Sequence, residues 1–151
     1  MLLFRICRRP FRALDGEGAR LYGGRWNEPG RPVVYLSTSI ALAALEYLVH
    51  VDPDDAPDDL ATLTVEVPDD ATVETVDVTT LPGDWARASE SATCREVGER
   101  WLRNGRALLL RVPSVLVPEE SNVLLDPRHP DAERARVVGE RPFVFDPRSM
   151  E

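Results

Sequence analysis

Residues 20–30 read Arg-Leu-Tyr-Gly-Gly-Arg-Trp-Asn-Glu-Pro-Gly, residues 33–37 read Val-Val-Tyr-Leu-Ser, and residues 44–50 read Ala-Leu-Glu-Tyr-Leu-Val-His. The first segment is rich in glycine and ends in proline and glycine, so it predicts a loop. The second predicts a short buried strand, and the third belongs to an apolar helix. We expect the loop, the strand and the helix to bring Arg25, Tyr35 and Glu46 together in one site.

Working outward, residues 2–6 predict a strand, and residues 8–32 predict a long loop of the kind that usually carries function. After the short strand at residues 33–36, a helix is expected that is capped by Ser37, Thr38 or Ser39 and runs to about residue 49. It is apolar on nearly every face, which predicts that it packs on both sides.

The remainder alternates short apolar runs with turn residues, so we expect a strand-rich α+β fold with few helices, as one domain over residues 1–151. A second helix should open at Ser89 or Ser91 and end at Gly105. Trp26 and Trp101 are expected in the core. The other strands are expected at residues 33–36, 60–67, 72–78, 107–112, 115–117, 123–125 and 143–145.

Bulk properties exclude several classes of protein. No apolar run approaches the roughly 20 residues that span a bilayer, and the first residues do not resemble a secretory signal. We therefore expect a cytoplasmic protein with no membrane contact. Cys7 and Cys94 are expected as reduced, inert thiols. His50 and His129 have no partners at metal-ligand spacing, so no metal site is expected.

The charge distribution points to a small anionic ligand. The net charge is −8, and the chain contains no lysine. Residues 1–31 hold seven arginines against three acidic residues, a local charge of +4. The acidic remainder argues against direct nucleic-acid binding. A local arginine cluster suits a phosphate-bearing molecule, because the guanidinium matches phosphate oxygens two at a time.

Each candidate residue has a functional and a structural interpretation. Glu46 stands among apolar residues, so it is either paired or driven towards its neutral form; it could serve a site or a structural ion pair with an arginine. Arg25, after Gly23 and Gly24, could clamp a phosphate or simply occupy a turn. Tyr35 could stack on a flat ring or pack in the core.

The loop expected around residues 119–122 contains two further polar candidates. Ser121 and Asn122 could hydrogen bond to a ligand, or they could cap a turn. No histidine is placed to activate Ser121, which argues against a serine-hydrolase triad.

Taken together, these motifs resemble the RES domain family. The resemblance covers nearly the whole chain, and its most specific part is Gly-Gly-Arg-Trp-Asn at residues 23–27. The motifs that carry it are residues 4–6 (Phe-Arg-Ile), 18–19, 23–27, Gly30, 34–37 (Val-Tyr-Leu-Ser), 44–46 (Ala-Leu-Glu), 121–124 (Ser-Asn-Val-Leu), 126–127 and the close at 145–148.

The resemblance implies a toxin of a bacterial type II toxin–antitoxin system, with a fold similar to ADP-ribosyltransferases of the diphtheria-toxin class. Such toxins consume NAD+ as a substrate by cleaving its nicotinamide–ribose bond, with water or inorganic phosphate as the attacking group. No prosthetic group is implied. The implied partner is an Xre-like helix-turn-helix antitoxin, within a multimeric complex.

The family is named for an arginine, a glutamate and a serine, which here would be Arg25, Glu46 and Ser121. In the implied roles, these three are catalytic, whereas Arg5, Tyr35 and Asn122 bind the substrate. Two other functions stay open. One is ADP-ribosylation of a protein target, and the other is a catalytically inactive binding module on the same scaffold.

Overall fold

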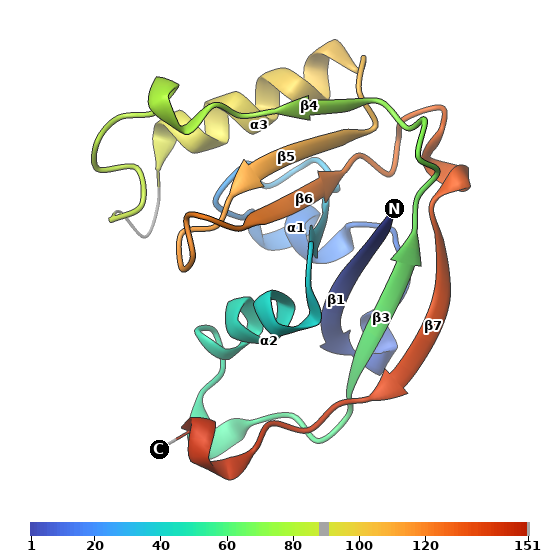
Figure 1. Cartoon of the computed structure of the whole chain (residues 1–151), viewed down its shortest axis with the longest axis vertical. Coiled ribbons are helices and arrows are strands. Elements are labelled where there is room, and N and C mark those ends of the chain that lie inside the picture. The colour runs from blue at the N-terminus through green and yellow to red at the C-terminus, as the bar shows by residue number, and fades with distance from the viewer. Residues whose placement is uncertain (88–90, 151) are drawn as a thin grey trace.

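The chain folds around one seven-stranded mixed sheet, as the computed structural model shows for residues 1–87 and 91–150 (Figure 1). The strand order is β4-β5-β6-β2-β1-β3-β7, and among the strands in the described ranges only the β4–β5 pair is parallel. The strands are β1 (Leu2–Arg8), β2 (Val34–Ser37), β3 (Leu60–Glu66), β4 (Val73–Thr75), β5 (Leu109–Pro113), β6 (Ser121–Leu125) and β7 (Arg136–Pro142).

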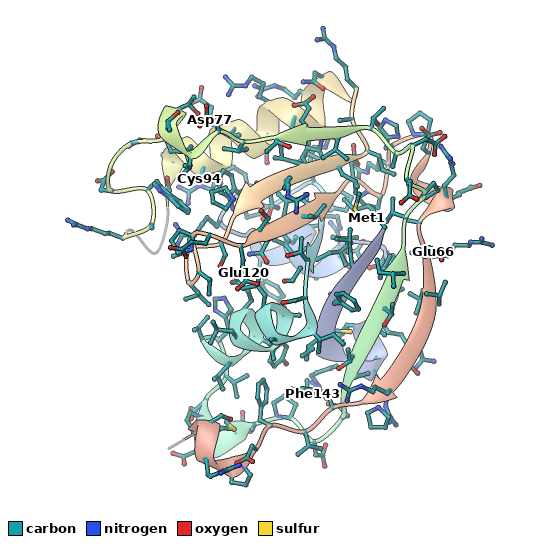
Figure 2. All side chains as sticks on the ribbon, in the orientation of Figure 1. Met1, Glu66, Asp77, Cys94, Glu120 and Phe143 are labelled. Carbon is teal, nitrogen blue, oxygen red and sulfur yellow. The ribbon has the colours of Figure 1, made fainter. Side chains whose placement is uncertain are left out.

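The sheet bends sharply between β2 and β1, where a single residue pair, Phe4 with Ser37, joins the two halves. In Figure 1, β4, β5 and β6 run across the upper part of the view, and β1, β3 and β7 run steeply down its right side. Apolar side chains from both halves fill the angle between them, and this cluster includes Leu3, Leu36, Val65 and Leu125. The amino terminus closes one end of the angle: the Met1 ammonium bonds to the Asp69 carboxylate and lies beside the end of β3 (Figure 2).

Within the residues that the structure describes, three helices and several short 3-10 turns accompany the sheet. The helices are α1 (Glu17–Tyr22), α2 (Ile40–Leu48) and α3 (Ala92–Asn104). The turns are η1 (Arg9–Phe11), η2 (Pro53–Asp55), η3 (Val78–Thr80), η4 (Ala132–Arg134) and η5 (Pro147–Met150).

Helix α2 begins as expected, because the Ser39 hydroxyl accepts a hydrogen bond from the Leu42 amide. Its expected burial on both sides is wrong. Leu42 and Ala43 are buried, whereas Leu45 and Val49 face solvent. The helix therefore packs on β1 with one face and leaves another open, and this arrangement lets Glu46 reach a cleft.

Helix α3 is capped by Ser91, which accepts from the Cys94 amide, and it ends at Gly105 in the left-handed region. Ser89, the other expected cap, lies outside the residues that the structure describes. Trp26 and Trp101 are buried in the cluster beneath α3, as expected. Gly98 of α3 touches the loop closely, since a Cβ there would lie 1.7 Å from the Trp26 carbonyl oxygen.

Four sequence expectations need correction. Residues 17–22 form α1 inside the expected loop, and residues 136–142 form the edge strand β7. Residues 115–117 form a turn instead of a strand. Residues 143–145 also form no strand: Phe143 and Phe145 contact edge to face, and Phe145 stacks on Tyr47 of α2.

Within residues 1–87 and 91–150, no helix is both long and apolar enough to cross a membrane. The same ranges contain no group of three histidine, cysteine or acidic side chains that could hold a metal ion. Cys7 and Cys94 are both free and buried.

Candidate active site

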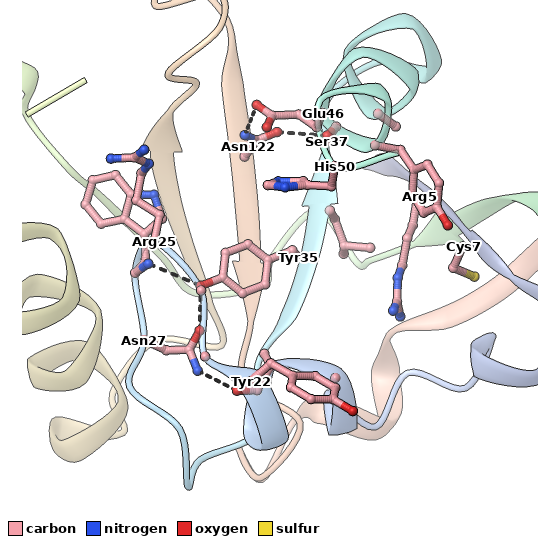
Figure 3. Close-up of a pocket in the computed structure, with 18 of the residues that line it drawn as sticks. Arg5, Cys7, Tyr22, Arg25, Asn27, Tyr35, Ser37, Glu46, His50 and Asn122 are labelled. Atoms are coloured by element: carbon pink, nitrogen blue, oxygen red, sulfur yellow. Dashed lines mark hydrogen bonds between the residues drawn. The ribbon is translucent and has the colours of Figure 1, made fainter. Parts of the chain in front are cut away.

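A cleft of about 1150 Å³ opens beside the bend of the sheet. Its walls come from β1, the segment from α1 to the Trp26 loop, β2, α2 and the start of β6. Five of the six residues that the sequence singled out line it: Arg5, Arg25, Tyr35, Glu46 and Asn122. Segments far apart in the sequence thus converge on one cavity (Figure 3).

Glu46 is fixed by two neutral donors. Its Oε1 accepts a hydrogen bond of 2.7 Å from the Ser114 hydroxyl and another of 2.7 Å from the Asn122 side-chain amide. Asn122 is oriented in turn, because its Oδ1 accepts from the Ser37 hydroxyl at 2.8 Å. No residue in the described ranges forms a salt bridge with Glu46, so the ion pair considered from the sequence is not observed there.

Ser114 is the site residue that sequence reasoning missed. It is fully buried, and its hydroxyl donates to Glu46 while accepting from the amides of Leu116 and Val117. These bonds fold residues 114–117 into a turn, so one hydroxyl both shapes the turn and holds the carboxylate. The Pro113-Ser114 dipeptide signals a chain turn, but nothing local connects it with Glu46, 68 residues earlier.

Ser121 is the expected site residue that does not line the cleft. It is the first residue of β6, and its neighbour Asn122 turns its side chain towards Glu46. Adjacent residues of a strand point to opposite faces, so the Ser121 side chain faces away from Glu46. Its backbone carbonyl accepts from both the amide and the hydroxyl of Thr38, just before α2.

Arg25 is presented by a tight turn. Gly23 has a φ of 73°, and Gly24 and Asn27 bridge across the turn through their backbones. Gly24 also has to be small, because a Cβ there would lie 2.5 Å from the Tyr35 hydroxyl. The half-buried Arg25 guanidinium donates to the Trp85 carbonyl at 3.1 Å. That bond leaves most of the donors of the fork available to a ligand.

Tyr35 supports this turn from β2. Its hydroxyl donates to Asn27 Oδ1 at 2.6 Å and accepts from the Trp26 amide at 3.2 Å. Burial raises the pKa of Tyr35 well above its usual range, so the phenol stays neutral and keeps its donor. Asn27 is fully buried and also donates to the carbonyls of Ala19 and Glu28. The Tyr35 hydroxyl therefore holds the turn at Trp26 and Asn27 in place, and the Tyr35 ring forms part of the cleft wall.

Arg5 lies across the cleft from Arg25, with Tyr35 between them (Figure 3). Among the described residues, its half-buried guanidinium has no hydrogen-bond or ion-pair partner. Cys7, two residues along β1, also lines the cleft. Burial raises the pKa of the Cys7 thiol, and the nearby Arg5 charge opposes this only in part. The thiol is thus a neutral wall group.

The cleft combines two arginine side chains, one aromatic ring and one carboxylate that is fixed by hydrogen bonds to one of its two oxygens. Such a cleft suits an elongated anion whose reacting end meets Glu46, because the arginines can bind phosphate oxygens while the carboxylate faces developing positive charge.

A comparison with protein families identifies the group to which the chain belongs. The family model described as the RES domain matches residues 2–146. The chain belongs to the RES domain family. Toxin Res of Photorhabdus laumondii is 42% identical over 133 residues, which cover 87% of this chain and 85% of that protein. The Prs ADP-ribosylating toxin of a Sphingobium species is 40% identical over 139 residues, covering 91% and 86%. The RES chain is thus a member of a family of toxins.

Among solved structures, the fold is similar to one in the crystal structure of the M. tuberculosis MbcT–MbcA toxin–antitoxin complex. The TM-score is 0.78 over 94% of this chain and 83% of that one, at 19% sequence identity. The expected strand-rich α+β fold with a few helices is confirmed.

Proposed function

We propose that this RES protein is a toxin enzyme that cleaves the nicotinamide–ribose bond of NAD+. The observation that carries the proposal is the mounting of Glu46. Its Oε1 is held by Ser114 and Asn122, whereas Oε2 accepts no hydrogen bond from any residue in the described ranges. A carboxylate anchored through one oxygen is pre-organised to present the other oxygen to a substrate.

The chemistry of NAD+ fits this arrangement. Departure of nicotinamide leaves positive charge on the ribose, in an oxocarbenium-like transition state that an adjacent carboxylate stabilises. Nicotinamide departs as a neutral molecule, so the reaction needs no strong general acid. Glu46 would also accept hydrogen bonds from the ribose hydroxyls.

The other cleft residues match the remaining parts of the dinucleotide. Arg25 and Arg5 supply guanidinium groups for the pyrophosphate or the ribose edge. Tyr35 offers an aromatic face for nicotinamide, with Asn122 and Ser114 holding Glu46 in place. The cavity volume of about 1150 Å³ lies slightly above the range of ordinary small-molecule pockets, which leaves room for an extended dinucleotide.

The same family relationship supports an antitoxin partner. One related fold comes from a toxin–antitoxin complex. In the present chain, exposed apolar side chains stand at the rim of the cleft, including Phe11, Leu21 and Tyr22, and Tyr22 is 85% exposed. We propose that an Xre-like antitoxin covers this rim and blocks access to Glu46 in a multimeric complex.

A second candidate is ADP-ribosylation of a protein, and the name of the 40% identical Sphingobium relative favours it. Both reactions break the same bond and differ in the acceptor. In the first, water or phosphate attacks the ribose, and in the second, a protein side chain does.

One experiment separates these acceptors. The purified protein is incubated with NAD+ labelled in its adenylate part, with and without phosphate, and with a cell extract that lacks the toxin. Free ADP-ribose indicates hydrolysis, its 1″-phosphate indicates phosphorolysis, and label on protein indicates transfer. If the folded protein yields none of the three, the catalytically inactive binding module becomes the better account.

A further inference from the structure

A second, smaller cavity of about 230 Å³ lies where β3 and β7 meet the start of α2. Among the described residues, it shares no lining residue with the cleft described above. Six of the described residues line it, and three of them carry side-chain hydrogen-bond donors: Thr62, Thr64 and Arg141. Ile40, the first residue of α2, completes one wall.

Thr62 is the unusual residue of this cavity. It is 2% exposed, and its Oγ1 is buried with no hydrogen-bond partner. Leaving a buried hydroxyl unpaired costs on the order of 1–3 kcal/mol, so such a group calls for a ligand or another explanation. Thr62 pairs with Arg141 across the two strands, and Thr64 pairs with Gly139. Side chains two residues apart share a face, so the two threonines and Arg141 line one side.

Gly139 keeps the space open. A Cβ at this position would lie 3.5 Å from both the Cβ and the Oγ1 of Thr64, at ordinary contact distance. Opposite Thr64, β7 therefore contributes no side chain to fill the cavity.

The start of α2 adds donors to the same place. The Ser39 hydroxyl is taken by the Leu42 amide, but the amides of Ile40 and Ala41 make no hydrogen bond to any described residue. Unpaired amides at a helix start, together with the helix dipole, favour an anion.

Arg141 supplies the positive charge at this cavity. Among the described residues, the only side-chain bond of Arg141 is a long one of 3.4 Å to the neighbouring Pro142 carbonyl. Glu140 also borders the cavity, but its carboxylate forms an ion pair with Arg12 at 3.7 Å. In the sheet, Glu140 lies opposite Leu63, so its side chain belongs to the other face of the strand.

We propose that this cavity binds a small oxyanion, for which inorganic phosphate is the probe. The anion would accept from the Thr62 and Thr64 hydroxyls, from the Arg141 guanidinium and from the first amides of α2. It would join β3 and β7 to the start of the helix that carries Glu46. This inference concerns a separate cavity and does not depend on the proposed NAD+ chemistry.

Phosphate binding is tested by calorimetric titration of the purified chain at constant ionic strength, with chloride as the background anion. Saturable binding is expected. Thr62→Val has the same shape without the hydroxyl, and Arg141→Gln removes the charge; each should weaken binding about tenfold or more, because each removes a bond to a charged ligand. Arg136→Gln, on the same strand but outside the cavity, should bind as the parent chain does.

A second variant distinguishes this cavity from the cleft. Arg25→Gln removes a cleft cation, and phosphate binding should survive it. In phosphate-free buffer, Thr62→Val should be as stable as the parent chain or more so, since it removes an unpaired buried hydroxyl. Absence of saturable binding, or binding that Arg25→Gln abolishes and Thr62→Val leaves intact, would overturn the proposal.

Discussion

Replacing Ser114 with alanine removes one of the two hydrogen bonds that hold Glu46 and both bonds that close the turn after Pro113. A hydrogen bond to a charged group contributes about 1.5–3 kcal/mol. If that energy orients Glu46 for the transition state, kcat for NAD+ cleavage should fall about 10- to 100-fold with little change in KM. Asn122 still holds Oε1, so activity should not vanish.

The same substitution should cost about 1–2 kcal/mol of folding free energy, since the Leu116 and Val117 amides lose their buried acceptor but lie near solvent. The matched control is Ser121→Ala, whose side chain points away from Glu46 and should change kcat about twofold or less. Both are measured by nicotinamide release at saturating NAD+, with circular dichroism confirming the fold. A large loss of kcat in Ser121→Ala together with a normal kcat in Ser114→Ala would refute the conclusion that Ser114 is the serine that positions Glu46.

Two further predictions concern stability. Gly98→Ala should destabilise the protein by about 1–3 kcal/mol and lower Tm by several degrees, because the new Cβ meets the Trp26 carbonyl at 1.7 Å. The control Gly83→Ala, with nothing within 4 Å of its Cβ, should leave Tm nearly unchanged. Equal Tm values for Gly98→Ala and Gly83→Ala would contradict the close contact between Gly98 and the Trp26 carbonyl. Burial raises the pKa of the Cys7 thiol in the folded protein, so folding favours the neutral thiol. The resulting contribution to folding stability is complete below the ordinary thiol pKa of about 8.5, and it is lost as the pH rises through the higher pKa of the folded state. The urea concentration at the unfolding midpoint should therefore fall less between pH 7.5 and pH 9.5 in Cys7→Ala than in the parent chain. If the midpoints of the two proteins fall in parallel with pH, the Cys7 thiol makes no such contribution.

The sequence located the residues whose surroundings are local. Glu46 stood out because its own helix is apolar, and Arg25 because glycines precede it. The Tyr35 strand follows from a short apolar run. These signals need no knowledge of distant contacts, and the structure places all three residues on one cleft.

The elements that were missed depend on contacts that no local pattern encodes. Helix α1 has six residues between two glycines, too few for a periodic pattern to stand out. Strand β7 is an edge strand with little burial, so its residues show no alternation.

The two serines illustrate the same limit at the site. Which face Ser121 occupies is set by the register of β6 against β2, and a shift of one residue would reverse it. The contact of Ser114 with Glu46 arises only when the turn after β5 meets α2. The family resemblance indicated Ser121, and only the folded structure shows that Ser114 is the serine whose hydroxyl contacts the Glu46 carboxylate.

In the proposed function, Glu46 drives cleavage of NAD+ in this cleft. The decisive measurement is the free nicotinamide, determined by chromatography, that NAD+ releases when incubated with the purified chain or with Glu46→Gln, which keeps the shape of the side chain and removes its charge. Calorimetry on both proteins shows whether NAD+ still binds. We predict release by the parent chain and at least about a hundredfold less by Glu46→Gln, with NAD+ binding and Tm largely retained. Equal release by the two folded proteins would contradict the account.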